Sequence, residues 1–227
     1  MPTVKQNTPK AFVFDAYGTL FRLKSGVLSV PPDEQFLVTQ IQDTWRLRQV
    51  EYTWLSAMMG RWIDFDEVTR SALDYALEFH EARDESLKEK LLTVYSDPTT
   101  FDDVPPTLEY LKEKGIPLAI LSNGNSEKLQ SALTNLGING FFQAVLSAAK
   151  VKTYKPSPSV YQLVTDHFRC EPKEVVFISS NGWDIAGAAS FGFYTVWVNR
   201  LGIPFEQLGV APNQKLNSLK DFVYPLA

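Results

Sequence analysis

The stretch Ala11-Phe12-Val13-Phe14-Asp15-Ala16-Tyr17-Gly18-Thr19-Leu20 decides the fold of this chain. Its first four residues form a short apolar run between polar neighbours, which predicts a buried strand. The run ends at Asp15, and Gly18 favours a turn soon after it. An acidic residue in this position either caps the turn or lies in an open crevice. The rest of the chain has to decide between these two interpretations.

Further apolar runs of strand length occur much later in the chain, and helical patterns lie between them. This alternation predicts an α/β fold with a Rossmann-like, doubly wound parallel sheet. Ligands of such sheets bind at the carboxyl ends of the strands. Asp15, Ser122, Ser179 and Asn181 fall at or just beyond those ends, so we expect them to meet. The predicted strands are 11–14, 117–121, 144–147, 175–179 and 194–198, and the predicted helices are 107–114, 126–136, 160–167 and 185–191.

Residues 22–100 follow a different pattern and contain no convincing strand. A helix start is predicted at Pro32-Asp33, and apolar residues then recur at helical spacing over 37–59. Two more helices are predicted at 65–79 and 87–95. We therefore expect 1–21 and 101–227 to form the catalytic core, with 22–100 inserted after the first strand as a helical cap. After Leu201 we expect a loop and a short helix.

Composition excludes several classes of protein. The chain has 227 residues, of which 44% are hydrophobic and 21% charged, as is ordinary for a globular protein. Its net charge is −4 and no Lys/Arg-rich run occurs, so we expect no nucleic-acid partner. No apolar window approaches the ~20 residues that span a bilayer. The first ten residues lack the apolar stretch of a signal peptide, and the single cysteine, Cys170, fits a reducing compartment. These features predict a cytoplasmic protein with no membrane partner.

Four separated motifs, taken together and in order, resemble the haloacid dehalogenase superfamily over nearly the full length of the chain. In that superfamily the first aspartate is a nucleophile that forms a covalent intermediate, which the resemblance implies for Asp15. The motifs are Asp15-Ala16-Tyr17-Gly18-Thr19, Leu121-Ser122-Asn123, Lys155-Pro156 and Ser179-Ser180-Asn181-Gly182-Trp183-Asp184.

Two positions depart from the magnesium-dependent phosphatases of this superfamily. Those enzymes carry a second aspartate two residues after the first, as general acid, where this chain has Tyr17. A phenol with a pKa of about 10 is a poor acid at neutral pH. Ser180 stands where phosphatases have another acidic metal ligand, so Asp15 and Asp184 alone would offer Mg²⁺ few oxygen ligands. We therefore expect no metal and no cofactor.

The departures suit a leaving group that needs no proton, such as a halide. The closer resemblance is to the L-2-haloacid dehalogenases, carried by residues 179–184 and by Trp45-Arg46-Leu47-Arg48-Gln49-Val50-Glu51-Tyr52-Thr53-Trp54-Leu55. It implies hydrolysis of short-chain L-2-haloacids to 2-hydroxy acids, with inversion at C2 and an ester on Asp15. It also implies a homodimer.

The resemblance assigns roles around the nucleophile. Asp15 attacks C2, Thr19 orients its carboxylate, and Lys155 keeps that carboxylate ionised. Asp184 pairs with Lys155, and Tyr161 supports these residues around the nucleophile. The residues that position the hydrolytic water with Asp184 are Ser179 and Asn181.

On the substrate side, the resemblance places Arg46 and Asn123 at the leaving halide, because a fixed cation stabilises developing negative charge. Ser122 holds the substrate carboxylate together with backbone N–H groups near Ala16, Tyr17 and Asn123. The apolar pocket wall is expected from Tyr17, Phe65 and Trp183.

Three other interpretations remain open. The first is a magnesium-dependent small-molecule phosphatase that tolerates Tyr17. The second is a binding protein without activity, although Asp15, Arg46, Lys155 and Asp184 are all present. The third is activity on an unexpected leaving group such as fluoride. The water-activating group stays undecided among Asp184, Asn181 and Lys155.

Overall fold

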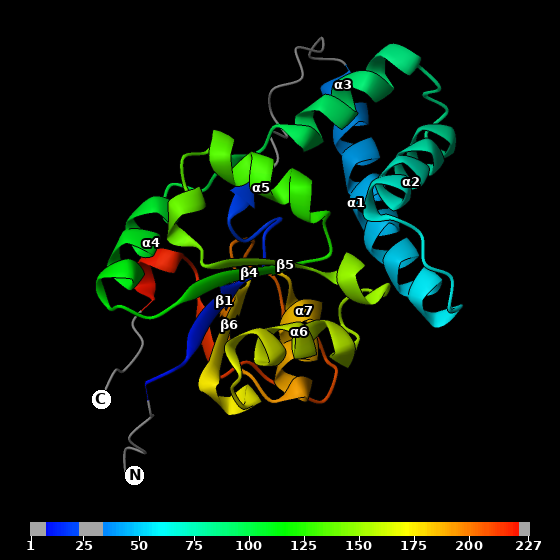
Figure 1. Cartoon of the computed structure of the whole chain (residues 1–227). Coiled ribbons are helices and arrows are strands. Elements are labelled where there is room, and N and C mark those ends of the chain that lie inside the picture. The colour runs from blue at the N-terminus through cyan, green and yellow to red at the C-terminus, as the bar shows by residue number, and fades with distance from the viewer. Residues whose placement is uncertain (1–7, 23–33, 223–227) are drawn as a thin grey trace.

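The computed structural model describes residues 8–22 and 34–222, and a six-stranded sheet with the order β5-β4-β1-β6-β7-β8 forms its centre (Figure 1). Every neighbouring pair in this sheet is parallel. The chain builds outward from β1 in both directions, so β1 is the switch point at which ligands of α/β sheets bind. The strands are β1 (Ala11–Phe14), β4 (Leu118–Ser122), β5 (Ala144–Ser147), β6 (Val175–Ser179), β7 (Tyr194–Val198) and β8 (Gln214–Leu216).

The alternation of side chains in β1 explains why both faces of the sheet are covered. Phe12 and Phe14 belong to one buried cluster with residues of α4 and α5, whereas Ala11 and Val13 belong to another with residues of α6 and α7. Successive residues of a strand point to opposite faces, so each face needs its own helical layer. The doubly wound α/β fold is therefore confirmed. These helices are α4 (Val104–Glu113), α5 (Ser126–Asn135), α6 (Pro158–Phe168) and α7 (Gly182–Phe191).

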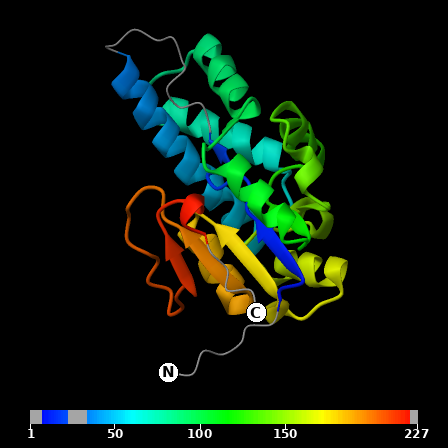
Figure 2. The same ribbon diagram turned by 90° about the vertical axis from the view of Figure 1, so that its left-hand side faces the viewer.

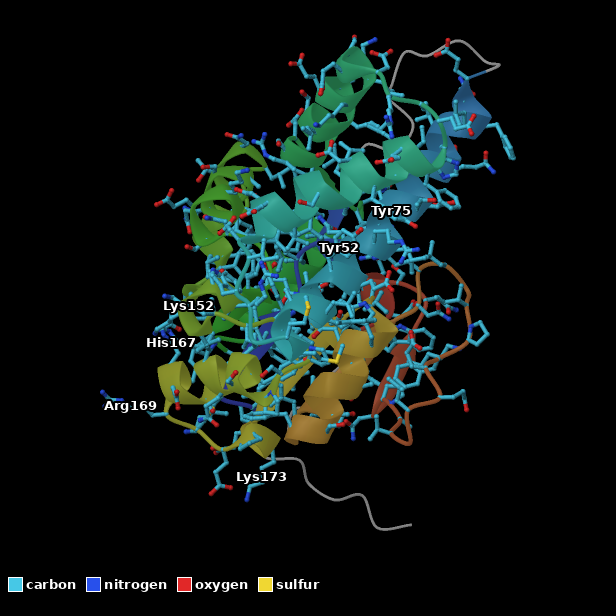
Figure 3. The ribbon with its side chains drawn as sticks, turned by 90° about the vertical axis from the view of Figure 1, so that its right-hand side faces the viewer. Tyr52, Tyr75, Lys152, His167, Arg169 and Lys173 are labelled. Atoms are coloured by element: carbon cyan, nitrogen blue, oxygen red, sulfur yellow. The ribbon has the colours of Figure 1, made fainter. Side chains whose placement is uncertain are left out.

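Three helices lie between β1 and the rest of the sheet in the chain, namely α1 (Gln35–Met58), α2 (Phe65–Phe79) and α3 (Glu85–Ser96). They share a buried cluster of their own, to which α1 contributes Trp45 and α2 contributes Leu73. Tyr52 and Tyr75 meet edge to face across α1 and α2, with ring centroids 6.4 Å apart (Figure 3). Figure 2 shows the strands of the sheet pointing toward the side on which α1 and α2 lie. The predicted helix start at Pro32-Asp33 falls outside the described residues.

None of the helices in the described ranges combines the length and the apolar character needed to cross a membrane.

Two expectations about strands were wrong. Residues 22–100 contain β-structure, because β2 (Phe21–Arg22) pairs antiparallel with β3 (Thr99–Thr100). Each strand has two residues, which is too short for a period-two pattern to appear in the sequence. The segment after residue 201 contains β8 before its short helical turn at Leu219–Asp221. Gln214-Lys215-Leu216 is a half-exposed edge strand, so it lacks the apolar run of a buried strand.

Candidate active site

The carboxylate of Asp15 is held from several directions at the end of β1. The backbone N–H of Asp15 donates to the Ile178 carbonyl oxygen at 3.0 Å, which continues the pairing of β1 with β6. Its Oδ2 accepts from Asn181 Nδ2 at 2.8 Å and from Thr19 Oγ1 at 3.0 Å, with Ser179 Oγ at 3.5 Å. Its side chain is 9% exposed. The turn and the end of β6 therefore fix one oxygen of a nearly buried carboxylate.

The other oxygen of Asp15 faces an ammonium group. Lys155 Nζ donates to Asp15 Oδ1 at 3.2 Å and to Asp184 Oδ2 at 2.8 Å, and it lies 5.0 Å from the centroid of the Phe177 ring. Asp184 lies in the first turn of α7, where its Oδ1 accepts from the Tyr161 hydroxyl at 2.8 Å. Lys155, Asp184 and Tyr161 are all buried. This is a carboxylate–ammonium–carboxylate series in a dry environment.

Burial and the neighbouring charges shift the acidities of these groups. Burial raises the pKa of the Asp184 carboxyl to about 6, against the opposing effect of the Lys155 ammonium. Burial alone would lower the pKa of Lys155, but the carboxylates of Asp184 and Asp15 outweigh it and raise that pKa. Burial, together with the Asp184 carboxylate, raises the pKa of Tyr161 well above its ordinary value. At neutral pH the pair is thus ionised and Tyr161 is a hydrogen-bond donor.

A second cation approaches the site from α1. Arg46 Nη2 donates to Asn181 Oδ1 at 3.3 Å, and Arg46 Nη1 donates to Gln49 Oε1 at 2.9 Å. Gln49 is 1% exposed, and its Nε2 donates to Thr69 Oγ1 of α2 at 2.7 Å. Asn181 therefore joins the two halves of the site, because its amide contacts Asp15 on one side and Arg46 on the other.

A pocket of about 20 Å³ opens between these groups, and it is lined by residues at the carboxyl ends of the strands and the loops that follow them, and by residues of α1, α2 and α7. Ser122 and Asn123 both contribute to it, but they make other contacts as well. Ser122 Oγ accepts the Gly124 N–H at 3.1 Å, and Asn123 Oδ1 accepts the Lys155 N–H at 2.9 Å. Of the predicted substrate contacts, the lining includes Tyr17, Arg46, Phe65, Ser122, Asn123 and Trp183. Ala16, which lies in the chain between the lining residues Asp15 and Tyr17, is fully buried and is not part of the lining.

Two features of the site were missed from the sequence. Gln49 and Thr69 fix Arg46, yet they belong to different helices. A buried glutamine three residues after an arginine, within an apolar stripe, was the available signal. The second is Arg200, whose Nη2 donates to the Thr19 carbonyl oxygen at 2.9 Å and whose guanidinium pairs with Asp103. Arg200 follows β7 and Asp103 precedes α4, so no local pattern connects them.

The donor set around Asp15 does not fit a magnesium ion. The Lys155 ammonium lies between Asp15 and Asp184 and donates to one oxygen of each, while the second oxygens accept from other side chains. Mg²⁺ needs several oxygen ligands in octahedral geometry. No group of three or more His, Cys, Asp or Glu residues suited to a metal occurs in the described part of the chain.

Comparison with known proteins agrees with this geometry. The model of the haloacid dehalogenase-like hydrolases matches residues 9–192. The chain is 41% identical to (S)-2-haloacid dehalogenase 1 of Pseudomonas sp. (strain CBS-3), covering 93% of this chain and 94% of that enzyme. It is 40% identical to (S)-2-haloacid dehalogenase 4A of Burkholderia cepacia, covering 96% and 94%. L-2-haloacid dehalogenase from Xanthobacter autotrophicus, solved with chloropropionic acid covalently bound, superposes with a TM-score of 0.82 at 34% identity, covering 94% of this chain and 96% of that one. This chain therefore belongs to the haloacid dehalogenase-like hydrolase family.

Proposed function

We propose that this chain hydrolyses short-chain L-2-haloacids to 2-hydroxy acids, with inversion at C2, and that Asp15 forms the ester intermediate. The observation that carries the proposal is the Asp15 carboxylate, held by Thr19, Asn181 and Lys155 in a pocket that Arg46 also lines. The names of the relatives at 41% and 40% identity support the reaction. The chloropropionic acid bound covalently in the Xanthobacter enzyme supports the ester.

The two oxygens of Asp15 differ in a way that suggests which one attacks. Oδ2 accepts from Thr19 and Asn181, whereas Lys155 is the donor to Oδ1 within the described residues. Oδ1 has fewer donors than Oδ2 among these residues, so it has a lone pair open for an in-line attack on C2. The electron pair of the carbon–halogen bond leaves with the halide, which needs no proton. The Arg46 guanidinium would stabilise the departing anion, since a fixed cation in a dry site acts strongly on developing charge.

The second step returns the enzyme to its starting state. Water adds to the Asp15 carbonyl carbon, and cleavage of the acyl–oxygen bond releases the 2-hydroxy acid and restores the carboxylate. The Asp184 carboxylate, ionised beside Lys155, is placed to accept a proton from the attacking water and to return it to the departing alkoxide oxygen. The remaining proton of that water is lost to solvent from the new Asp15 carboxyl group. A carboxyl with a pKa of about 6 is well suited to this task near neutral pH. No step in this scheme uses a metal ion.

We further propose that residues 22–100 act as a cap over the core, supplying Arg46 and Phe65 to the pocket. A test is to exchange Arg46 for Lys, which keeps the charge but loses the two-pronged contact with Gln49 and Asn181. We expect slower halide release with unchanged folding. Wild-type turnover in this variant would remove Arg46 from the mechanism.

The homodimer and the cytoplasmic location remain predictions. Leu47, Leu55 and Met58 of α1 are 65%, 41% and 76% exposed at helical spacing, which supports α1 as the dimer contact. Light scattering of the wild type and of Leu47→Lys tests this, because the substitution should shift the mass toward a monomer. The free thiol of Cys170 supports a reducing compartment. Cell fractionation tests the location.

The decisive experiment measures halide release from L-2-chloropropionate in EDTA and again with added Mg²⁺. We expect release in EDTA from the L enantiomer, an inverted 2-hydroxy acid as product, and no release by Asp15→Asn. Asp43→Asn is the matched control, because it makes the same change at an exposed position of α1. Magnesium-dependent phosphate release from phosphate esters, without halide release, would show that the dehalogenase proposal is wrong and that the protein is a phosphatase.

A further inference from the structure

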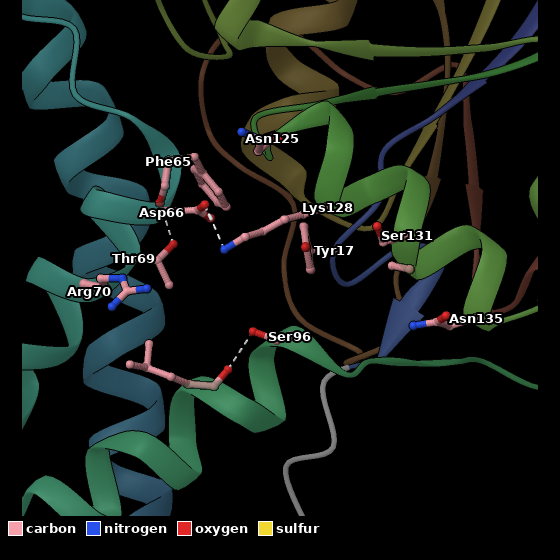
Figure 4. Close-up of a pocket in the computed structure, with 12 residues that line it drawn as sticks. Tyr17, Phe65, Asp66, Thr69, Arg70, Ser96, Asn125, Lys128, Ser131 and Asn135 are labelled. Carbon is pink, nitrogen blue, oxygen red and sulfur yellow. Dashed lines mark hydrogen bonds and ion pairs between the residues drawn. The ribbon is translucent and has the colours of Figure 1, made fainter.

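A second cavity, of about 180 Å³, lies between α2, α3 and α5 (Figure 4). Tyr17 and Phe65 line both this outer cavity and the pocket at Asp15. Their rings lie side by side, with centroids 6.4 Å apart and planes inclined by 31°. The two aromatic rings thus form the shared wall between the outer cavity and the nucleophile.

The inner pocket is narrow in the state described. Its volume of about 20 Å³ is close to the space that one water molecule needs. A haloacid has several more heavy atoms than water, so a movement of the pocket wall would give it room beside Asp15. A movement of the shared wall formed by Tyr17 and Phe65 would connect the inner pocket with the larger outer cavity.

The charges of the outer cavity favour an anion, although the whole chain carries a net charge of −4. Its lining includes Arg70, Lys128 and the carboxylate of Asp66. Lys128 Nζ pairs with Asp66 Oδ2 at 2.8 Å, and the two side chains are 53% and 33% exposed. Within residues 8–22 and 34–222, Arg70 forms no ion pair. The lining therefore contains one cation without an ion pair to a described residue and a second cation in a solvent-accessible pair.

The Lys128–Asp66 pair also connects the two sides of the cavity. Lys128 belongs to α5, which packs on the sheet, whereas Asp66 belongs to α2. Asp66 directly follows Phe65 in the first turn of α2. An anion that competes for Lys128 would weaken the contact between α2 and α5, next to the ring that closes the inner pocket.

We propose that this outer cavity is the entrance through which the 2-haloacid anion reaches Asp15, with Arg70 and Lys128 as the cations that receive its carboxylate. The proposal rests on the proposed dehalogenase function. It assigns to Lys128 a role in substrate capture and none in the chemical step. Capture by a fixed cation raises the rate of encounter with an anion, and salt screens this effect.

Two variants test the entrance. Lys128→Glu reverses one charge of the cavity, and we expect kcat/KM to fall about three- to ten-fold at low ionic strength. The difference from wild type should shrink as salt is added. Ser131→Trp places a large ring on the α5 face of the cavity, and we expect kcat/KM to fall at least five-fold at every salt concentration. The single-turnover rate at saturating substrate should stay at the wild-type value in both.

Matched controls separate the entrance from general effects. Lys220→Glu makes the same change in net charge at an exposed position outside the cavity, and Thr134→Trp adds the same ring to α5 outside the cavity lining. Both should retain wild-type kcat/KM. Wild-type kcat/KM in Lys128→Glu and Ser131→Trp, or equal losses in the controls, would overturn the proposal. Failure of the proposed function is distinguishable, because the wild type itself would then release no halide.

Discussion

Replacing Asp103 should show how much its ion pair with Arg200 contributes to stability. This ion pair supports the turn after Asp15, because Arg200 also contacts Thr19. Its carboxylate accepts from Arg200 at 2.8 and 3.0 Å, from Ser218 Oγ at 2.6 Å and from the Leu219 N–H at 2.9 Å. The Arg200 side chain is 12% exposed and also donates to the Thr19 carbonyl oxygen. Asp103→Ala would remove the acceptor of four hydrogen bonds and leave a nearly buried guanidinium without its counter-charge.

The expected cost is about 3–5 kcal/mol, because an uncompensated charge remains buried. For a domain of this size, each kcal/mol corresponds to roughly 2–4 °C, so the melting temperature should fall by about 6–20 °C. Urea unfolding at pH 7 measures the free energy directly. Asp102→Ala is the matched control, since Asp102 is the exposed neighbour in the chain, and it should cost no more than about 0.5 kcal/mol.

The pH dependence of this stability has a defined sign. Burial alone would raise the pKa of Asp103, but the hydrogen bonds from Arg200, Ser218 and the Leu219 N–H outweigh it and lower that pKa. The folded pKa is then below the unfolded value of about 3.9. The stabilisation is fully present above the unfolded pKa and is lost as the pH falls through the folded one. Equal losses in Asp103→Ala and Asp102→Ala at pH 7 would refute the reasoning.

The remaining predictions concern the surroundings of the catalytic groups. Because burial raises the pKa of Asp184 to about 6 and Asp184 acts in the hydrolysis of the ester, kcat for steady-state halide release should be constant above neutral pH and fall below about pH 6 with the slope of one proton. Tyr161→Phe removes a hydrogen bond that lowers the pKa of Asp184, so the same assay should place this acid limb at higher pH. Gln49→Ala removes the acceptor of Arg46 Nη1 and should lower kcat about ten-fold in steady-state assays, with circular dichroism at the assay temperature showing that the variant is folded. Gly187→Ala would place a Cβ 2.5 Å from the Tyr161 hydroxyl and 2.6 Å from Cβ of Pro156, so urea unfolding should show a loss of about 1–3 kcal/mol.

Residues at the ends of long, apolar strands could be placed from the sequence. Asp15 and Asn181 follow buried strands, and Ser122 and Ser179 are the last residues of theirs. Parallel strands end at one edge of the sheet. The four residues lie in or beside one pocket as a consequence. Their chemical roles stay predictions until the variants described above are measured.

Contacts between distant segments could not be predicted in this way. Asp103 and Arg200 are 97 residues apart, and neither lies in a recognisable motif. Gln49 and Thr69 meet because α1 packs on α2. The apolar pattern of each helix shows which face is buried, but it does not show how one helix is rotated relative to the other. β8 was not predicted for a different reason, because an edge strand can complete a sheet without an apolar run in its sequence.

Asn181 has a consequence for how such an enzyme can change during evolution. Under the proposed mechanism, the groups that hold the nucleophile come from the sheet, whereas Arg46, at the leaving group, comes from a segment inserted into a single loop of the core. The two tasks are encoded in separate stretches of the gene, and the Asn181 amide contacts the residues of both. Recombination or mutation within residues 34–96 can therefore alter which group is displaced while the attacking carboxylate, and the ester it forms, are inherited unchanged.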